Sequence, residues 1–147
     1  MITTVRNGFF VGSLSGITLG LFFKAIELIT GQKVYRLLLN IDYIPVLKQI
    51  HFPEIIEFLF HIAVSIIISI ALLLLMNYQR WIQRRIIILT TLLNICIGLL
   101  FFPTTALSDQ TPEITNIPAL LLWLVGHLIY GLILGILLRT VTVNHNV

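Results

Sequence analysis

Four long apolar runs alternate with short polar segments along the chain. They cover about residues 8–29, 55–76, 86–102 and 118–138. About 20 apolar residues are what a helix needs to cross the hydrocarbon core of a bilayer. Pro103 cannot continue the hydrogen-bond ladder of the third run, and Pro118 suits the first turn of a fourth helix. The pattern predicts an all-α integral membrane four-helix bundle, with residues 1–147 forming a single membrane domain.

The composition agrees with this pattern. Of the 147 residues, 58% are hydrophobic and 10% are charged, and the mean hydropathy is +1.03. A soluble domain has about 45–50% apolar and ~25% charged residues. The expected partner is therefore a lipid bilayer. The net charge of +3 is too diffuse for a nucleic-acid surface, so we expect no nucleic-acid partner.

The connection over residues 32–53 is longer than a turn and too charged to span. It mixes apolar residues such as Tyr35 and Leu38 with Lys33, Arg36 and Asp42. A short interfacial helix, with its apolar side toward the lipid and its charges toward water, explains this mixture. An irregular re-entrant or covering loop explains it equally well.

The positions of the basic residues suggest an orientation, because cytoplasmic flanks of membrane helices carry an excess of Lys and Arg. With both termini cytoplasmic, the inner side holds five arginines: Arg6, Arg80, Arg84, Arg85 and Arg139. All six acids fall on the opposite side: Glu27, Asp42, Glu54, Glu57, Asp109 and Glu113. We therefore expect both termini in the cytoplasm.

Glycines recur at steps of four in two of the predicted spans. The first span contains Gly8, Gly12, Gly16 and Gly20, and the fourth contains Gly131 and Gly135 with Gly126 just upstream. Small residues let membrane helices approach closely. We expect helix-packing faces here, with the first and fourth spans against each other or each against a copy of itself. A homo-oligomer or another membrane protein is then a candidate partner.

The polar residues inside the spans are few. In the second span, Glu57, His61, Ser65 and Ser69 form a stripe at steps of four. At ~1.5 Å of rise per residue, His61, Asn94 and His127 lie at a similar depth in the outer half of the membrane, below Lys24 and Glu27. The sequence thus predicts a polar intramembrane cluster of six residues: Glu57, His61, Ser65, Asn94, His127 and Tyr130. Alternatively, each side chain only hydrogen-bonds a neighbouring helix and contributes to packing.

The residue types of this cluster suit some kinds of chemistry better than others. No nucleophile motif, Gly-rich phosphate loop or metal-protease signature is present, so we expect no enzyme and no catalytic residue. Two histidines on facing helices are able to clamp a haem, but without further spacing constraints we expect no cofactor and no metal. Intramembrane histidines and a carboxylate are also the parts of proton relays. The leading hypothesis is a protonatable site in a pH or envelope-stress response, and the alternatives are a small proton-coupled transporter, a haem-binding protein or a structural subunit.

Short motifs connect the chain to a known family. They are His61-x-x-x-Ser65, Phe102-Pro103, Gly126-His127-Leu128 before Arg139, and Gly12-x-x-x-Gly16 before Lys24 and Glu27. Together they resemble the YagU-like family of uncharacterised bacterial inner-membrane proteins, although Gly98 stands where that family has a further histidine. The resemblance implies a four-helix architecture and a location in the bacterial cytoplasmic (inner) membrane.

Overall fold

The computed structural model describes residues 2–42, 44, 46–47, 50, 52–79 and 83–143, and this part contains no strand. Its helices are α1 (Ile2–Thr30), α2 (Val34–Leu39), α3 (Glu54–Gln79), α4 (Gln83–Phe101), the 3-10 helix η1 (Phe102–Leu107) and α5 (Ile117–Val143). Four helical segments are long and apolar enough to cross a membrane, the third of them formed by α4 with η1. The predicted all-α four-helix membrane bundle is confirmed, and the chain is a membrane protein.

Part of the 32–53 connection is helical. The six residues of α2 form a helix shorter than two turns, and its Tyr35, Leu37 and Leu39 are buried against the bundle. The predictions at residues 43, 45, 48, 49 and 51, and that at Arg80, lie outside the described residues.

Local chemistry explains where the long helices begin and end. Gly31 follows α1 with a positive φ of 71°, and its N–H donates to the carbonyl of Glu27, as at a glycine C-terminal cap. Glu54 and Glu57 lie in the first turn of α3, where the helix dipole favours negative charge. Asn116 caps α5, because its side-chain oxygen accepts the backbone N–H of Ala119.

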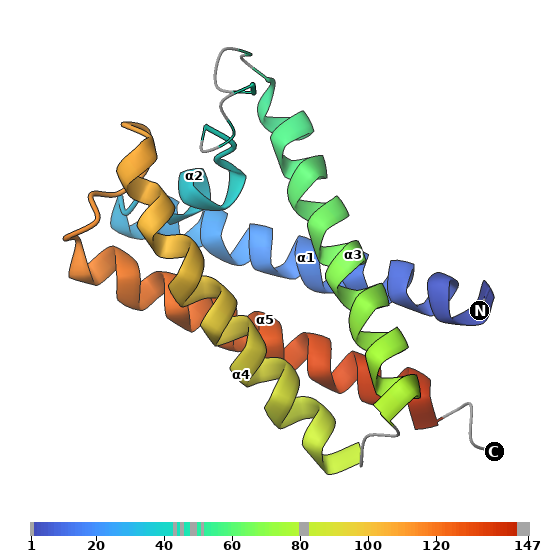
Figure 1. Cartoon of the computed structure of the whole chain (residues 1–147). Helices are drawn as coiled ribbons and strands as arrows, with labels where there is room; N and C mark the ends of the chain where they lie inside the picture. Colours follow the sequence, from blue (N-terminus) through green and yellow to red (C-terminus); the bar gives the residue numbers. More distant parts are fainter. Residues whose placement is uncertain are drawn as a thin grey trace.

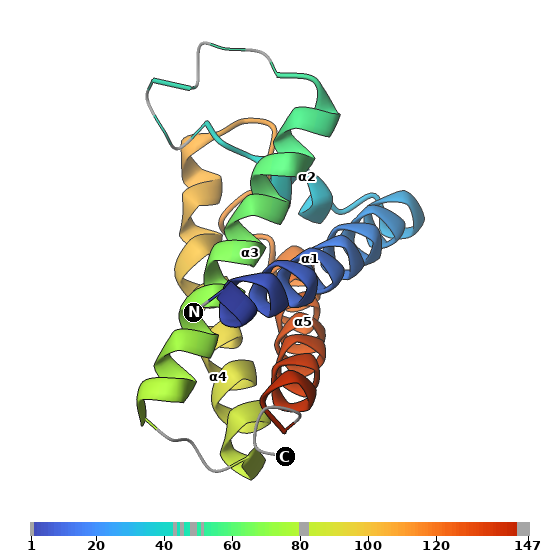
Figure 2. The same ribbon diagram turned by 90° about the vertical axis from the view of Figure 1, so that its right-hand side faces the viewer.

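The helices pack as two pairs. α1 lies against α3, α4 lies against α5, and the pairs meet where α1 crosses α5 (Figures 1 and 2). The described parts of α3 and α4 make almost no contact with each other. The start of α1, the end of α3, the start of α4 and the end of α5 lie at one end of the bundle, whereas α2 and η1 lie at the other (Figure 1).

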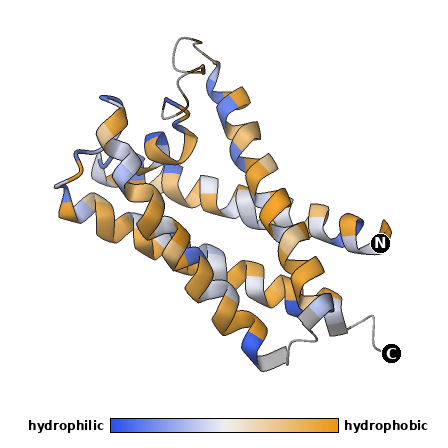
Figure 3. Cartoon of the chain, viewed as in Figure 1, coloured by the Kyte–Doolittle hydropathy of each residue, from blue (hydrophilic) through white to orange (hydrophobic). Residues whose placement is uncertain are grey.

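α1 is longer than an upright span requires. Its 29 residues measure about 43 Å at ~1.5 Å per residue, against a hydrocarbon core of ~30 Å. A helix of this length fits a bilayer by tilting. α1 runs obliquely across α3 and α5 in Figures 1 and 2, and apolar residues dominate the long helices (Figure 3).

The glycine rows lie inside the helix pairs. A Cβ added to Gly12 would lie 2.5 Å from the Cα of Ile66 on α3, and one added to Gly131 would lie 2.7 Å from the Cα of Thr91 on α4. The first and fourth spans do contact each other, as one of the two alternatives expected, but the two glycine rows do not face each other across that contact. Antiparallel neighbours joined by one connection reach each other first, so Gly8, Gly12, Gly16 and Gly20 face α3, while Gly131 and Gly135 face α4.

α1 and α5 still meet, through aromatic residues and one glycine. The ring of Phe23 stacks on that of Trp123, with centroids 5.0 Å apart and planes 11° apart. Gly126 lies directly against the Phe23 ring, where a side chain would collide with it. This contact joins the two helix pairs at the level of the candidate site.

Candidate functional site

A pocket with a cavity volume of about 130 Å³ lies between α3 and α4. Leu19 of α1, Trp123 of α5 and residues 37–41, in and after α2, also line it. The volume is close to that of an apolar cavity of about 150 Å³ that holds a benzene ring. The pocket therefore accommodates a small polar group or the end of an acyl chain.

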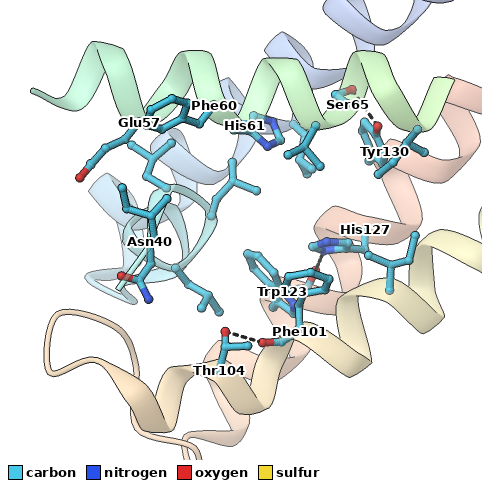
Figure 4. A pocket seen from close by; sticks show the side chains of 18 of the residues that line it. Asn40, Glu57, Phe60, His61, Ser65, Phe101, Thr104, Trp123, His127 and Tyr130 are labelled. Atoms are coloured by element: carbon cyan, nitrogen blue, oxygen red, sulfur yellow. Dashed lines mark hydrogen bonds between the residues drawn. The ribbon is translucent and has the colours of Figure 1, made fainter. Parts of the chain in front are cut away.

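All six residues of the predicted polar cluster line this pocket: Glu57, His61, Ser65, Asn94, His127 and Tyr130. Figure 4 shows Glu57 at one end and the rings of His61 and His127 pointing into the cavity from α3 and α5. Asn94 comes from α4 and is almost completely buried. Ser69, the last member of the predicted stripe, is fully buried one turn beyond Ser65 and does not line the pocket.

Backbone carbonyls hold both histidines. His61 Nε2 lies 3.0 Å from the carbonyl oxygen of Gly16, and His127 Nδ1 lies 2.9 Å from that of Trp123. A carbonyl oxygen only accepts, so these two nitrogens carry the hydrogens in the neutral rings. His61 Nδ1 and His127 Nε2 are therefore left as acceptors.

The same reasoning orients the other polar groups. The Ser65 hydroxyl donates to the carbonyl of Gly12 at 2.7 Å, so the Tyr130 hydroxyl, 2.7 Å from Ser65 Oγ, must be the donor between them. The side-chain amide of Asn94 donates to the carbonyl of Thr90 at 2.8 Å. Backbone carbonyls of the helices thus accept most of the hydrogen bonds that these polar side chains donate.

Trp123 is a pocket residue that the sequence analysis missed. Its indole N–H donates to the carbonyl of Gly98 at 2.8 Å, and its ring centroid lies 4.4 Å from that of His127. The two residues are four positions apart, so one helical face presents both. This spacing was the signal available in the sequence.

The residues after the first span were also missed. Leu37, Leu39 and Asn40 line the outer end of the pocket, and the nitrogen of the Asn40 amide is buried without a partner among the described residues. Because α2 is so short, nothing in its sequence pattern indicated which side chains reach the cavity.

A second cavity, of about 430 Å³, lies beyond the first at the end of the bundle that carries α2. The two cavities share Glu57, Leu39 and Asn40 in their linings. Lys24 and Glu27, predicted to lie above the cluster, line this second cavity together with Arg36 and Asp42. The polar cavity therefore adjoins the intramembrane pocket at Glu57.

Two carboxylates of this polar cavity hold α2 in place. Glu27 Oε2 accepts the backbone N–H groups of Tyr35 and Arg36 at 2.7 and 3.0 Å. Glu54 Oε1 accepts from Lys24 Nζ at 2.7 Å and from the Tyr35 hydroxyl at 3.0 Å. Burial, together with this hydrogen bond and the nearby carboxylates, raises the pKa of Tyr35 to about 12.

Within the described part of the chain, no group of three His, Cys, Asp or Glu side chains is placed to hold a metal ion. The titratable side chains of the pocket are Glu57, His61, His127 and Tyr130. What the arrangement can do chemically is accept hydrogen bonds and take up protons. No protein-family model, curated protein or solved structure matches the chain.

Proposed function

We propose that the pocket between α3 and α4 is a protonatable site through which this membrane protein responds to pH on its outer side, without being an enzyme. The observation that carries the proposal is that His61 and His127 share one pocket, whose end at Glu57 adjoins a polar cavity. Histidine changes charge close to physiological pH. Each ring keeps one nitrogen free of the backbone and available for a proton.

The groups that face the two histidines are few. Glu57 comes from α3 and Tyr130 from α5, and the pocket lining contributed by α1, α2 and α4 contains no ionisable side chain. The charges of Lys24, Arg36 and Asp42 lie in the second cavity. A proton bound by either histidine therefore has Glu57 as its nearest partner of opposite charge in the lining.

Trp123 offers a direct test, because a protonated imidazole next to an indole quenches its fluorescence. Replacing the other tryptophan by Trp81→Phe leaves Trp123 as the only reporter. We expect its emission in detergent micelles to fall reversibly between pH 8 and pH 4, and the fall to vanish in His127→Phe. A flat emission profile in a protein that keeps its helical circular dichroism would contradict the proposal.

A cellular test addresses the pH response itself. Cells that carry His61→Phe and His127→Phe together should survive an acid challenge less well than cells with the wild-type protein at equal abundance. The matched control is Leu128→Phe. Leu128 is next to His127 in the chain, is half-exposed and does not line the pocket. Equal survival of all three strains would remove the role in acid response.

We further propose the bacterial inner membrane as the location, with both termini cytoplasmic, and membership of the YagU-like family. Arg6, Arg85 and Arg139 lie toward one end of the bundle, and the positive-inside rule makes this end cytoplasmic. Reporter fusions in the α3–α4 link should be active only in the cytoplasm. Periplasmic activity at that link would reverse the orientation.

A proton-coupled transporter is the second candidate, favoured by the interior beyond the pocket. The hydroxyls of Ser69 and Thr90, one turn past Ser65 and Asn94, are buried without a partner among the described residues. Beyond them the interior is apolar, with Leu72, Met76 and Ile86 almost fully buried. Polar groups thus lead from the pocket into the bundle and end at this apolar interior, as in a proton path that is open at one end only. Proton uptake by protein-containing vesicles under an imposed pH gradient would support transport, and a leak equal to that of empty vesicles would exclude it.

A further inference from the structure

The polar side chains in the otherwise apolar lining of the pocket present mainly hydrogen-bond acceptors. The Ser65 hydroxyl hydrogen and one N–H of each histidine are bound by helix carbonyls, and the Trp123 N–H is bound by Gly98. The Tyr130 hydroxyl hydrogen is bound by Ser65. The hydrogens left over in this set are one on the Asn94 amide and those of the Asn40 amide at the outer end. A ligand that satisfies the remaining lone pairs must itself be a donor.

The pocket also opens toward the lipid. α3 and α4 are splayed apart, and three lining residues on these helices remain substantially exposed: Phe60 at 39%, Val64 at 53% and Phe101 at 46%. These side chains face the bilayer, so a hydrocarbon chain can lie between the helices with one end inside the pocket. Glu57 adds the only carboxylate of the lining.

We propose that this pocket binds an amphiphile that carries a primary ammonium group on a hydrocarbon chain. The N–H groups donate to the free nitrogens of His61 and His127 and to the Asn94 oxygen, Glu57 supplies the opposite charge, and the chain lies in the opening between α3 and α4. An anionic headgroup would meet lone pairs and a carboxylate, which disfavours it. This inference rests on the proposed function in using the same two histidines, but it does not require that they titrate.

The test compares three probes with the same twelve-carbon chain in detergent micelles. Dodecylamine has N–H donors, dodecyltrimethylammonium has the charge without them, and dodecanoate has the opposite charge. A ligand that binds only the folded state raises its stability. We expect dodecylamine to raise the unfolding temperature by at least about 3 °C, and the other two probes to have little effect. Equal effects of dodecylamine and dodecyltrimethylammonium in the wild-type protein would overturn the proposal without any variant.

A matched pair of variants locates the site. Val64→Phe fills the opening, whereas Ile67→Phe adds the same ring to an exposed position of α3 outside the pocket. The dodecylamine shift should be lost in Val64→Phe and kept in Ile67→Phe. If both variants keep the shift, the amine binds elsewhere and the proposal fails.

One further result distinguishes the two possible sources of the ammonium group, and another distinguishes this inference from the proposed function. The same shift from added phosphatidylethanolamine would identify an aminolipid headgroup as the ligand, and a shift from dodecylamine alone would identify a single-chain amine. If no amine stabilises the protein while Trp123 still reports protonation, this inference fails and the proposed function stands. If dodecylamine stabilises the protein while the Trp123 emission does not change with pH, the proposed function fails and this inference stands.

Discussion

The hydroxyl of Tyr130 on α5 lies 2.7 Å from that of Ser65 on α3. Ser65 in turn donates to the carbonyl of Gly12 on α1, so three helices are joined by two consecutive hydrogen bonds. All three residues are buried, and the close approach of α1 at Gly12 makes its carbonyl reachable. The bonds join α1, α3 and α5 at the part of the pocket that Ser65 and Tyr130 line.

Removal of either hydroxyl should have a modest and coupled effect. We expect Tyr130→Phe and Ser65→Ala each to lower the free energy of unfolding by about 0.5–1 kcal/mol, since interhelical hydrogen bonds in membranes average about 0.6 kcal/mol. The double variant should cost less than the sum of the two, because both changes remove the same bond. Reversible unfolding in mixed micelles measures this cycle, and strict additivity would contradict the shared bond.

Two glycines of the same row should tolerate alanine differently. The Cβ of Gly12→Ala would meet the backbone of Ile66, whereas that of Gly20→Ala would meet the ring of Phe58, which can turn aside. We expect a loss of about 2 kcal/mol or more for Gly12→Ala and less than about 1 kcal/mol for Gly20→Ala. Thermal unfolding in micelles gives the order, and a larger loss at Gly20 would contradict the described α1–α3 contact.

Glu27 should act as the cap of α2. Glu27→Ala leaves the N–H groups of Tyr35 and Arg36 without their acceptor, at a cost of about 1 kcal/mol, and Glu27→Gln should restore part of it. Faster amide hydrogen exchange in the 33–40 segment is the expected readout. Glu113→Gln, an exposed change before α5, serves as the control. Unchanged exchange in Glu27→Ala would show that α2 does not depend on this carboxylate.

Tyr35 should make stability fall in alkali. Its pKa is raised from about 10 in the unfolded chain to about 12 in the folded protein, so the folded state holds the phenolic proton more tightly. The resulting stability is complete below pH 10 and is lost as the pH rises from 10 through 12. In Tyr35→Phe this part of the decline should disappear, as should one phenol ionisation in the 295 nm absorbance. Parallel declines of the two proteins would contradict the raised pKa of Tyr35.

The four spans and the polar cluster were predictable because both depend on periodicity within a helix. Steps of four put Glu57, His61 and Ser65 on one face, and equal depth brought Asn94 and His127 to their level. These relations need only the helix rise and the membrane thickness. The structure places all six predicted residues around one pocket for this reason.

The choice of helix partners was not predictable in the same way. A glycine row shows which face of a helix allows close approach, but it does not show which helix packs there. The rows at Gly12 and Gly131 have nearly the same sequence pattern, so the pattern does not assign a different partner to each. The contribution of Asn40 was hidden for a different reason, since it follows a six-residue helix whose position depends on bonds between Glu27 and the backbone of Tyr35 and Arg36.

The packing of the helices in two pairs determines what sets the width of the pocket. Close backbone approach at Gly12 and Gly131 holds α1 against α3 and α4 against α5, so the two pairs are the units that enclose the pocket between α3 and α4. The pairs meet where the Phe23 ring lies against Trp123 and Gly126, and where the hydroxyls of Ser65 and Tyr130 lie 2.7 Å apart. A change in ring size at Phe23 is therefore expected to alter the separation of α3 and α4, and it would also reach the ring of His127, whose centroid lies 6.0 Å from that of Phe23.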